Sequence, residues 1–113
     1  IRLMDISDWL SQNPGPYEVC LLTFFPGENA SEYTAGRVSL RADSADVRDG
    51  VVAFCQGEPQ SPAGEIVLVR GAFVDPQATD NGWAAGYANL QVSVDGFYPD
   101  VVVTVRKADD SDA

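Results

Sequence analysis

The stretch Gly64–Val94 reads GEIVLVRGAFVDPQATDNGWAAGYANLQVSV, and it decides how the rest of the chain is interpreted. It contains two segments with the composition of β-strands, Glu65–Val74 and Tyr87–Val94. Twelve residues, DPQATDNGWAAG, separate them, whereas a simple hairpin connection uses about two to five residues. We therefore expect a long loop between two strands, with Trp83 in the middle of that loop.

The rest of the chain alternates apolar and polar residues with the period of a β-strand. Within Gly36–Ala42, Val38 and Leu40 are expected to face a core. The polar residues of that segment are expected to face solvent: Arg37, Ser39 and Arg41. Apolar runs of strand length occur at three further places: Tyr17–Phe25, Val51–Gln56 and Val101–Arg106. Two segments rich in turn residues and proline, DSADVRDG and GEPQSPAG, predict loops.

Helical spacing appears at the start of the chain, in RLMDISDWLSQNPGP. Asp5 can cap such a helix, Asp8 suits its first turn, and NPGP ends it. Trp9 lies on the apolar side, so we expect it to pack on the sheet. Six strands, one short helix and no strand–helix alternation predict an all-β domain, either a small barrel or a two-sheet β-sandwich.

The length of 113 residues fits a single domain, which we place at residues 1–107. Residues 108–113 are expected to form a disordered acidic tail. Seven basic residues against seventeen acidic ones give a net charge of -10. This charge argues against non-specific binding to phosphate polymers or to anionic lipid, and it also fits a salt-adapted surface. No apolar run approaches the ~18 residues of a membrane span, so no membrane contact is expected.

The chemistry of catalysis is sparsely represented. The chain has no histidine, which removes Ser-His-Asp, Cys-His and histidine–metal sites, and we expect no enzyme and no cofactor. Cys20 and Cys55 lie in apolar runs and are expected to be free thiols, which favours an intracellular location without excluding secretion. A calcium site is not expected, because the acidic residues of two loops lack EF-hand spacing: Asp75, Asp80 and Asn81, with Asp95 and Asp100.

The middle of the chain resembles the OB-folds of the replication protein A and telomere-end-binding families. Those folds often carry an "LRD…G…V…F" strand pair followed by "G-x-x-V-x-x-x-G-A". The matching residues here are Leu40, Arg41, Asp43, Gly50, Val52, Phe54, Gly64, Val67, Gly71 and Ala72. Two features depart from the pattern, because GEPQSPAG replaces the usual helix and a sixth strand follows the fifth.

The resemblance implies an OB-like barrel of five to six strands whose long loop forms one wall of a binding cleft. Basic and aromatic side chains would then grip a partner. These candidate binding residues are Arg37, Ser39, Arg41, Phe54, Arg70, Trp83 and Tyr87.

Three hypotheses for function remain open. The leading one is a non-enzymatic interaction module in a nucleic-acid maintenance complex (replication, repair or telomere), with a protein as its main partner because of its acidity. The second is a direct single-stranded DNA or RNA binder that uses an arginine–aromatic patch. The third is an extracellular β-sandwich that binds sugar or calcium. Nothing in the sequence specifies the oligomeric state.

Overall fold

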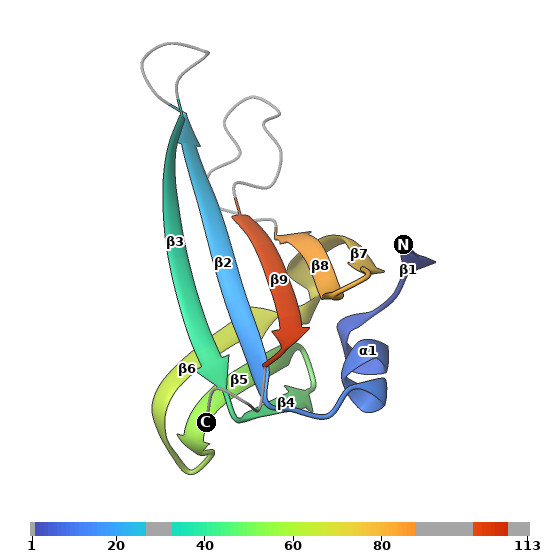
Figure 1. Cartoon of the computed structure of the whole chain (residues 1–113), viewed down its shortest axis with the longest axis vertical. Coiled ribbons are helices and arrows are strands. Elements are labelled where there is room, and N and C mark those ends of the chain that lie inside the picture. Colours follow the sequence, from blue (N-terminus) through green and yellow to red (C-terminus); the bar gives the residue numbers. More distant parts are fainter. Residues whose placement is uncertain (1, 27–32, 88–100, 109–113) are drawn as a thin grey trace.

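The computed structural model describes residues 2–26, 33–87 and 101–108, and in these ranges the chain consists mainly of β-strands (Figure 1). Six strands form one antiparallel sheet, in the order β1-β7-β8-β9-β2-β3. In this order their bounds are Arg2–Leu3, Phe73–Ala78, Gly82–Tyr87, Val101–Lys107, Tyr17–Pro26 and Tyr33–Ala42. A second antiparallel sheet has the order β4-β5-β6, with bounds Ser44–Arg48, Val51–Glu58 and Ser61–Val69.

The all-β fold class is therefore confirmed. Of the two predicted architectures, the two-sheet alternative is the one present, because no ladder joins the sheets into a closed barrel in the described ranges. One short helix, α1 (Ile6–Gln12), and one 3₁₀ turn, η1 (Arg70–Ala72), complete the elements. No helix in the described part of the chain is both long and apolar enough to cross a membrane.

The core lies between the two sheets, and strand alternation fills it. Val19 of β2 and Val105 of β9 are cross-strand partners that point inward, and both are buried. Phe54 of β5 meets them from the other sheet, where its ring lies edge-on to Tyr17 with the ring centroids 6.1 Å apart. A larger set of buried residues completes this core, including Ala42, Val52, Leu68, Ala85 and Val103.

Helix α1 covers one end of this core. As expected, Asp5 caps the helix: its carboxylate accepts a hydrogen bond from the Ser7 backbone N–H at 3.0 Å. Ile6 and Trp9 are buried, and Trp9 packs against Tyr17 with ring centroids 6.0 Å apart. The prediction that Trp9 packs on the sheet is confirmed.

The predicted long loop around Trp83 is wrong. Strands β7 and β8 form a hairpin whose turn occupies residues 79–81, where the Thr79 N–H donates to the Gly82 carbonyl at 2.8 Å. Trp83 lies in β8 with only 1% of its surface exposed. Its indole N–H donates to the Met4 carbonyl at 2.8 Å, and its ring lies edge-on to Phe73. The predicted strand at residues 87–94 lies outside the described residues except for Tyr87, which ends β8.

Two predicted loops also contain strands. DSADVRDG supplies β4, and GEPQSPAG holds the end of β5, a two-residue turn and the start of β6. The register shifts between Gln56 and Gly57, and Gly57 has φ +86°, so this glycine permits the irregularity that lets the hairpin continue. Val38 was expected to face a core, and it pairs with inward-facing Leu21, yet it is 55% exposed. The reason is that the β2–β3 ribbon extends past the smaller sheet (Figure 1).

Candidate binding groove on the outer face of the large sheet

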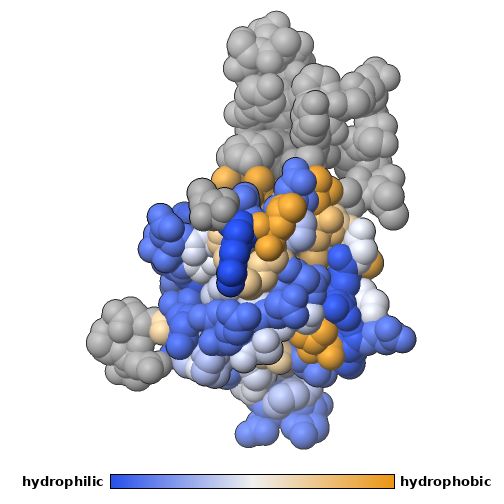
Figure 2. Space-filling view, turned by 90° about the vertical axis from the view of Figure 1, so that its right-hand side faces the viewer, coloured by the Kyte–Doolittle hydropathy of each residue, from blue (hydrophilic) through white to orange (hydrophobic). Residues whose placement is uncertain are grey.

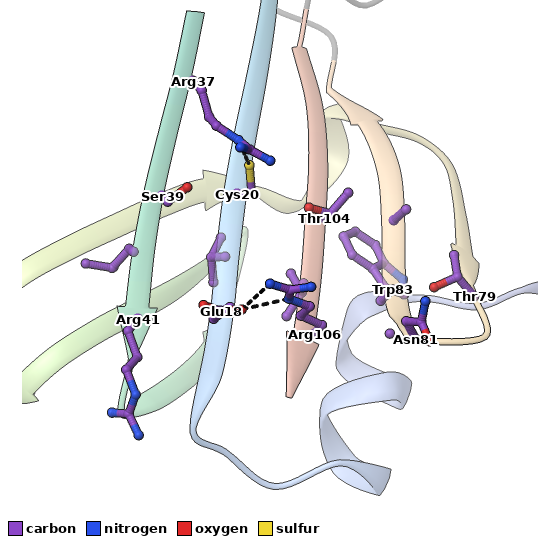
Figure 3. A pocket seen from close by; sticks show the side chains of 15 residues that line it. Glu18, Cys20, Arg37, Ser39, Arg41, Thr79, Asn81, Trp83, Thr104 and Arg106 are labelled. Atoms are coloured by element: carbon purple, nitrogen blue, oxygen red, sulfur yellow. Dashed lines mark hydrogen bonds and ion pairs between the residues drawn. The ribbon is translucent and has the colours of Figure 1, made fainter. Parts of the chain in front are cut away.

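A hollow of about 490 Å³ lies on the face of the six-stranded sheet that points away from the core. We call it the outer groove. Strands β3, β2, β9 and β8 form its floor, and the β7–β8 turn borders it through Thr79 and Asn81 (Figure 3). The polar and charged residues that line it are Glu18, Cys20, Arg37, Ser39, Arg41, Thr79, Asn81, Thr104 and Arg106.

Small side chains make this face concave. The strand registers align Ser39 with Cys20, Cys20 with Thr104, and Thr104 with Ala84, so a row of small residues crosses four strands. Two residues further along each strand, on the same face, the register aligns Arg41 with Glu18 and Glu18 with Arg106, so a row of long side chains runs beside the small ones. The difference in side-chain length between neighbouring rows produces the hollow.

The outer groove concentrates positive charge in an acidic chain. Three of the seven basic residues line it, Arg37, Arg41 and Arg106, and Glu18 is the one carboxylate among the lining residues in the described ranges. Arg106 pairs with Glu18 at 2.6 Å, and Arg41 pairs with Asp43 at 3.2 Å at the rim. All four side chains are substantially exposed, so water screens these pairs and both arginines can exchange partners at low cost.

Arg37 differs from the other two arginines. Within the described residues no carboxylate lies in ion-pair range of it, and its Nε donates instead to the Sγ of Cys20 at 3.3 Å. The guanidinium lies over the groove floor, and its bond to Cys20 is the one side-chain hydrogen bond it makes within the described residues (Figure 3). A planar fork of donors without a protein carboxylate is suited to bind an anion from outside.

Cys20 responds to this neighbour. Partial burial acts to raise the pKa of its thiol, but hydrogen bonds from Arg37 and Ser39, the charge of Arg37 and a hydrogen bond with Thr104 together bring the pKa below its ordinary value. Cys55 behaves oppositely, because burial and the neighbouring Glu65 carboxylate raise its pKa. Both thiols are free, as predicted, and they differ in exposure, since Cys55 is buried and Cys20 is half-buried.

The predicted site residues separate into two groups. Arg37, Ser39 and Arg41 come together in the outer groove, as expected for alternate residues of one strand. Phe54 and Trp83 are core residues, exposed by 0% and 1%, so neither presents a ring face on which a base or a sugar could stack. Trp83 is nevertheless among the residues that line the outer groove, whereas Phe54 is not, and the role of both residues in binding stays a prediction.

Arg70 and Tyr87 serve structure rather than the groove. Arg70 lies in η1, where it pairs with Asp5 at 3.5 Å and donates to the Ser7 hydroxyl, which ties the turn to α1. The Tyr87 hydroxyl accepts from the Val69 backbone N–H at 3.0 Å and so links the two sheets. Neither residue lines the outer groove.

Sequence reasoning missed six of the polar and charged lining residues: Glu18, Cys20, Thr79, Asn81, Thr104 and Arg106. Period-two alternation could have found Thr104 and Arg106, which are the outward positions of VVVTVRK. Its signal for Cys20 was weaker: Cys20 shares a face with the charged Glu18, but apart from Thr23 the residues after Glu18 are apolar on both faces.

The edge of the large sheet that holds β1 offers a different kind of surface. A second hollow lies between β1, α1 and β7, and three carboxylates border it: Asp5, Asp8 and Asp75. Figure 2 shows the side that carries β1 and α1, where the described surface is mainly hydrophilic and hydrophobic side chains form separate patches. No group of three or more His, Cys, Asp or Glu residues in the described ranges could hold a metal ion, and Asp95 and Asp100 lie outside those ranges.

No family model, no curated protein and no solved structure matches this chain. The OB-fold resemblance therefore stays a prediction from the sequence.

Proposed function

We propose that the protein is a non-enzymatic interaction module that binds an acidic segment of a partner protein through the outer groove. One observation carries this proposal: in a chain of net charge -10, three arginines line one hollow together with a single carboxylate. A local cluster of positive charge on a protein whose net charge is negative is typical of a recognition surface. Repulsion from the remaining acids is screened beyond about 8 Å at physiological salt.

The chemistry of the groove favours carboxylates over bases and sugars. Binding of single-stranded nucleic acid relies on exposed aromatic rings for stacking, and Trp83, the one aromatic residue among the described lining residues of the groove, is only 1% exposed. The groove instead offers guanidinium donors with the hydroxyl groups of Ser39 and Thr104, a set that matches carboxylate oxygens. A protein partner also agrees with the acidity of the chain, because a nucleic acid carries a negative charge at every phosphate whereas a protein segment can carry only a few carboxylates.

The third hypothesis, a β-sandwich that binds sugar or calcium, requires the two-sheet architecture that is present. The described residues, however, do not form a recognisable binding site for either ligand. Trp9, Tyr17, Phe54 and Trp83 are buried, Phe73 and Tyr87 pack against each other, and the acids in the described ranges form no metal-binding group. Direct binding of single-stranded nucleic acid remains the second candidate, because Arg37 and Arg41 lie on one face of one strand. The setting in a nucleic-acid maintenance complex is a proposal that rests on the resemblance alone.

Fluorescence anisotropy with two labelled probes tests the proposal. The first probe is a set of twelve-residue peptides that carry glutamates at varied spacing, and the second is an oligothymidine. We expect peptide binding that weakens at least tenfold in the double variant Arg37→Glu/Arg41→Glu. Arg48→Glu is the matched control, because Arg48 is an exposed β4 arginine outside the groove, and it should change the Kd less than twofold.

Two results would reject the proposal. One is that no acidic peptide binds at low salt. The other is that the oligothymidine binds more tightly than every peptide and its affinity falls with the same double variant, which would assign the groove to nucleic acid.

A further inference from the structure

We infer that the partner segment binds as an added β-strand along the free edge of β3, with carboxylates four residues apart that meet Arg37 and Arg41. The inference rests on the proposed function and specifies how the ligand lies. The edge supplies backbone hydrogen bonds, and the outer groove supplies the charges. Strand addition of this kind gives affinity through the main chain and selectivity through alternate side chains.

The edge of β3 is available in the described structure. β3 is the last strand of the six-stranded sheet and pairs with β2 on one side, and no strand in the described ranges pairs with its other side. Such an edge presents a row of backbone N–H and C=O groups that can accept a further strand. β6 passes beneath β3 and emerges beyond it, so an added strand would lie above this element (Figure 1).

The positions of the two arginines set the spacing of the carboxylates. Residues i and i+4 of a strand lie on the same face, and Arg37 and Arg41 are about 13 Å apart at ~3.3 Å per residue. An added strand has the same rise, so two of its carboxylates can meet both arginines when they too are four residues apart. Carboxylates three residues apart would point to opposite faces, and one of them would face away from the groove.

Alternate side chains of the added strand would lie on the face of the sheet that points away from the groove, and these side chains should be apolar. Val38 lies on that face and is 55% exposed, whereas Leu40 packs against the core cluster. At Gly64 on β6, a side-chain carbon would come within 3.0 Å of the Leu40 Cδ1. β6 thus lies close beneath β3 at this point. The ligand pattern that fits is acidic, apolar, small, apolar, acidic.

A second copy of this chain fits the same edge poorly. An antiparallel pairing of two β3 strands centred on Ser39 would place Arg37 of one copy opposite Arg41 of the other. Like charges directly opposite each other destabilise a strand pair, and each chain also carries a net charge of -10. Charge complementarity therefore selects an acidic strand from a different protein.

Four peptides test the inference with the intact chain. The first carries the core Glu-Val-Ser-Val-Glu between threonine flanks. The second has the same composition with its glutamates three residues apart. The other two are the first peptide with backbone N-methyl groups at one or the other set of alternate residues. In a strand, alternate N–H groups point in opposite directions, so only one methylated set can block the ladder.

We expect the first peptide to bind at least tenfold more tightly than the second. We also expect one methylated set to weaken its binding at least tenfold while the other leaves the Kd within twofold. If both spacings bind equally and both methylated peptides bind like the parent, the inference is overturned while the proposed function stands. If no acidic peptide binds, both are overturned. If the protein dimerises with increasing concentration and acidic peptides do not reverse this, a second copy occupies the edge of β3, and the inference is also overturned.

Discussion

The Nε of Arg37 donates a hydrogen bond to the Sγ of Cys20, 3.3 Å away on the neighbouring strand. Ser39, not Arg37, is the direct cross-strand partner of Cys20, so the contact runs diagonally across the floor of the outer groove. It joins the arginine without a carboxylate partner in the described residues to the one half-buried thiol. Any change in the position of Arg37 should therefore change the pKa and the reactivity of the Cys20 thiol.

Cys20 should be alkylated much faster than Cys55 by iodoacetamide at pH 7 to 8. Its lowered pKa increases the thiolate fraction, and it is more exposed, whereas burial and Glu65 raise the pKa of Cys55. Arg37→Gln should shift the pH–rate profile of Cys20 to higher pH, because the variant removes the charge that favours the thiolate. Mass spectrometry of each cysteine-containing peptide measures both rates.

Arg48→Gln serves as the control for that experiment, since Arg48 lies on β4, away from Cys20. A Cys20 profile that does not move in Arg37→Gln would show that the hydrogen bond does not stabilise the thiolate in solution.

Trp83→Ala should lower the free energy of unfolding by about 3–5 kcal/mol. The side chain is 1% exposed, it packs on Phe73, and its N–H satisfies the Met4 carbonyl. Trp83→Phe should cost less, because it keeps an aromatic ring and loses chiefly the hydrogen bond. Urea denaturation measures both, with exposed Val69→Ala as a control expected within about 0.5 kcal/mol. A Trp83→Ala variant as stable as the parent would place this residue outside the core.

Gly82→Ala should also destabilise the protein, by about 1–3 kcal/mol. A methyl group at this position would collide with the Val105 carbonyl oxygen and with Arg106, because β8 and β9 approach closely there. Gly71→Ala is the matched control, since a methyl group at that glycine of η1 would meet no atom within 4 Å. Thermal unfolding of the two variants should separate them clearly, and equal melting temperatures would contradict the close approach at Gly82.

The cap of α1 should make stability depend on pH below about pH 4. Hydrogen bonding from the Ser7 hydroxyl lowers the pKa of Asp5, burial opposes this, and the Ser7 N–H and Arg70 add to the lowering. A carboxyl with a lowered folded pKa stabilises the fold above its unfolded pKa of about 3.9, and the contribution is lost as the pH falls through the folded pKa. Asp5→Ala should therefore cost about 1 kcal/mol at pH 6 and less near pH 2.

Asp5→Asn separates charge from capping, because asparagine keeps a side-chain acceptor without a titrating carboxyl. Its difference from the parent should vanish at low pH. If the cost of Asp5→Ala is the same at pH 6 and pH 2, the carboxylate charge does not contribute to the cap.

Much of the fold could be predicted from local patterns. Alternation located β3, apolar runs of strand length located β2, β5 and β9, and the capping aspartate located α1, because in each case side chains on a single element decide the outcome. The hairpin around Trp83 could not be predicted in this way. GWAAGY lacks the β-branched residues that signal a strand, and Pro76 lies where β7 and β8 slip register. Pairing with β9 on one side and burial of Trp83 on the other hold β8 in place, and both are tertiary effects.

Only part of the candidate site could be predicted, because local patterns reveal what a single strand decides and not how strands are ordered in a sheet. Arg37, Ser39 and Arg41 belong to one strand, so period two was enough to place them on one face. Arg106 and Cys20 join them only because β2 lies between β3 and β9, an order that no local pattern specifies. Phe54 was assigned to a cleft by analogy with a barrel, and in two facing sheets the same strand position points into the core.

The most direct test of the central claim is a map of backbone amide shifts by NMR as the Glu-Val-Ser-Val-Glu peptide is titrated into the labelled protein. The largest changes in amide chemical shift should fall on residues of the outer groove. We predict saturable shifts that are largest in β3 from Arg37 to Arg41, with smaller ones at Cys20 and Thr104, and almost none in α1. Shifts that centre on α1 and β7, or that spread evenly over the surface without saturating, would contradict the assignment of the outer groove as the binding site.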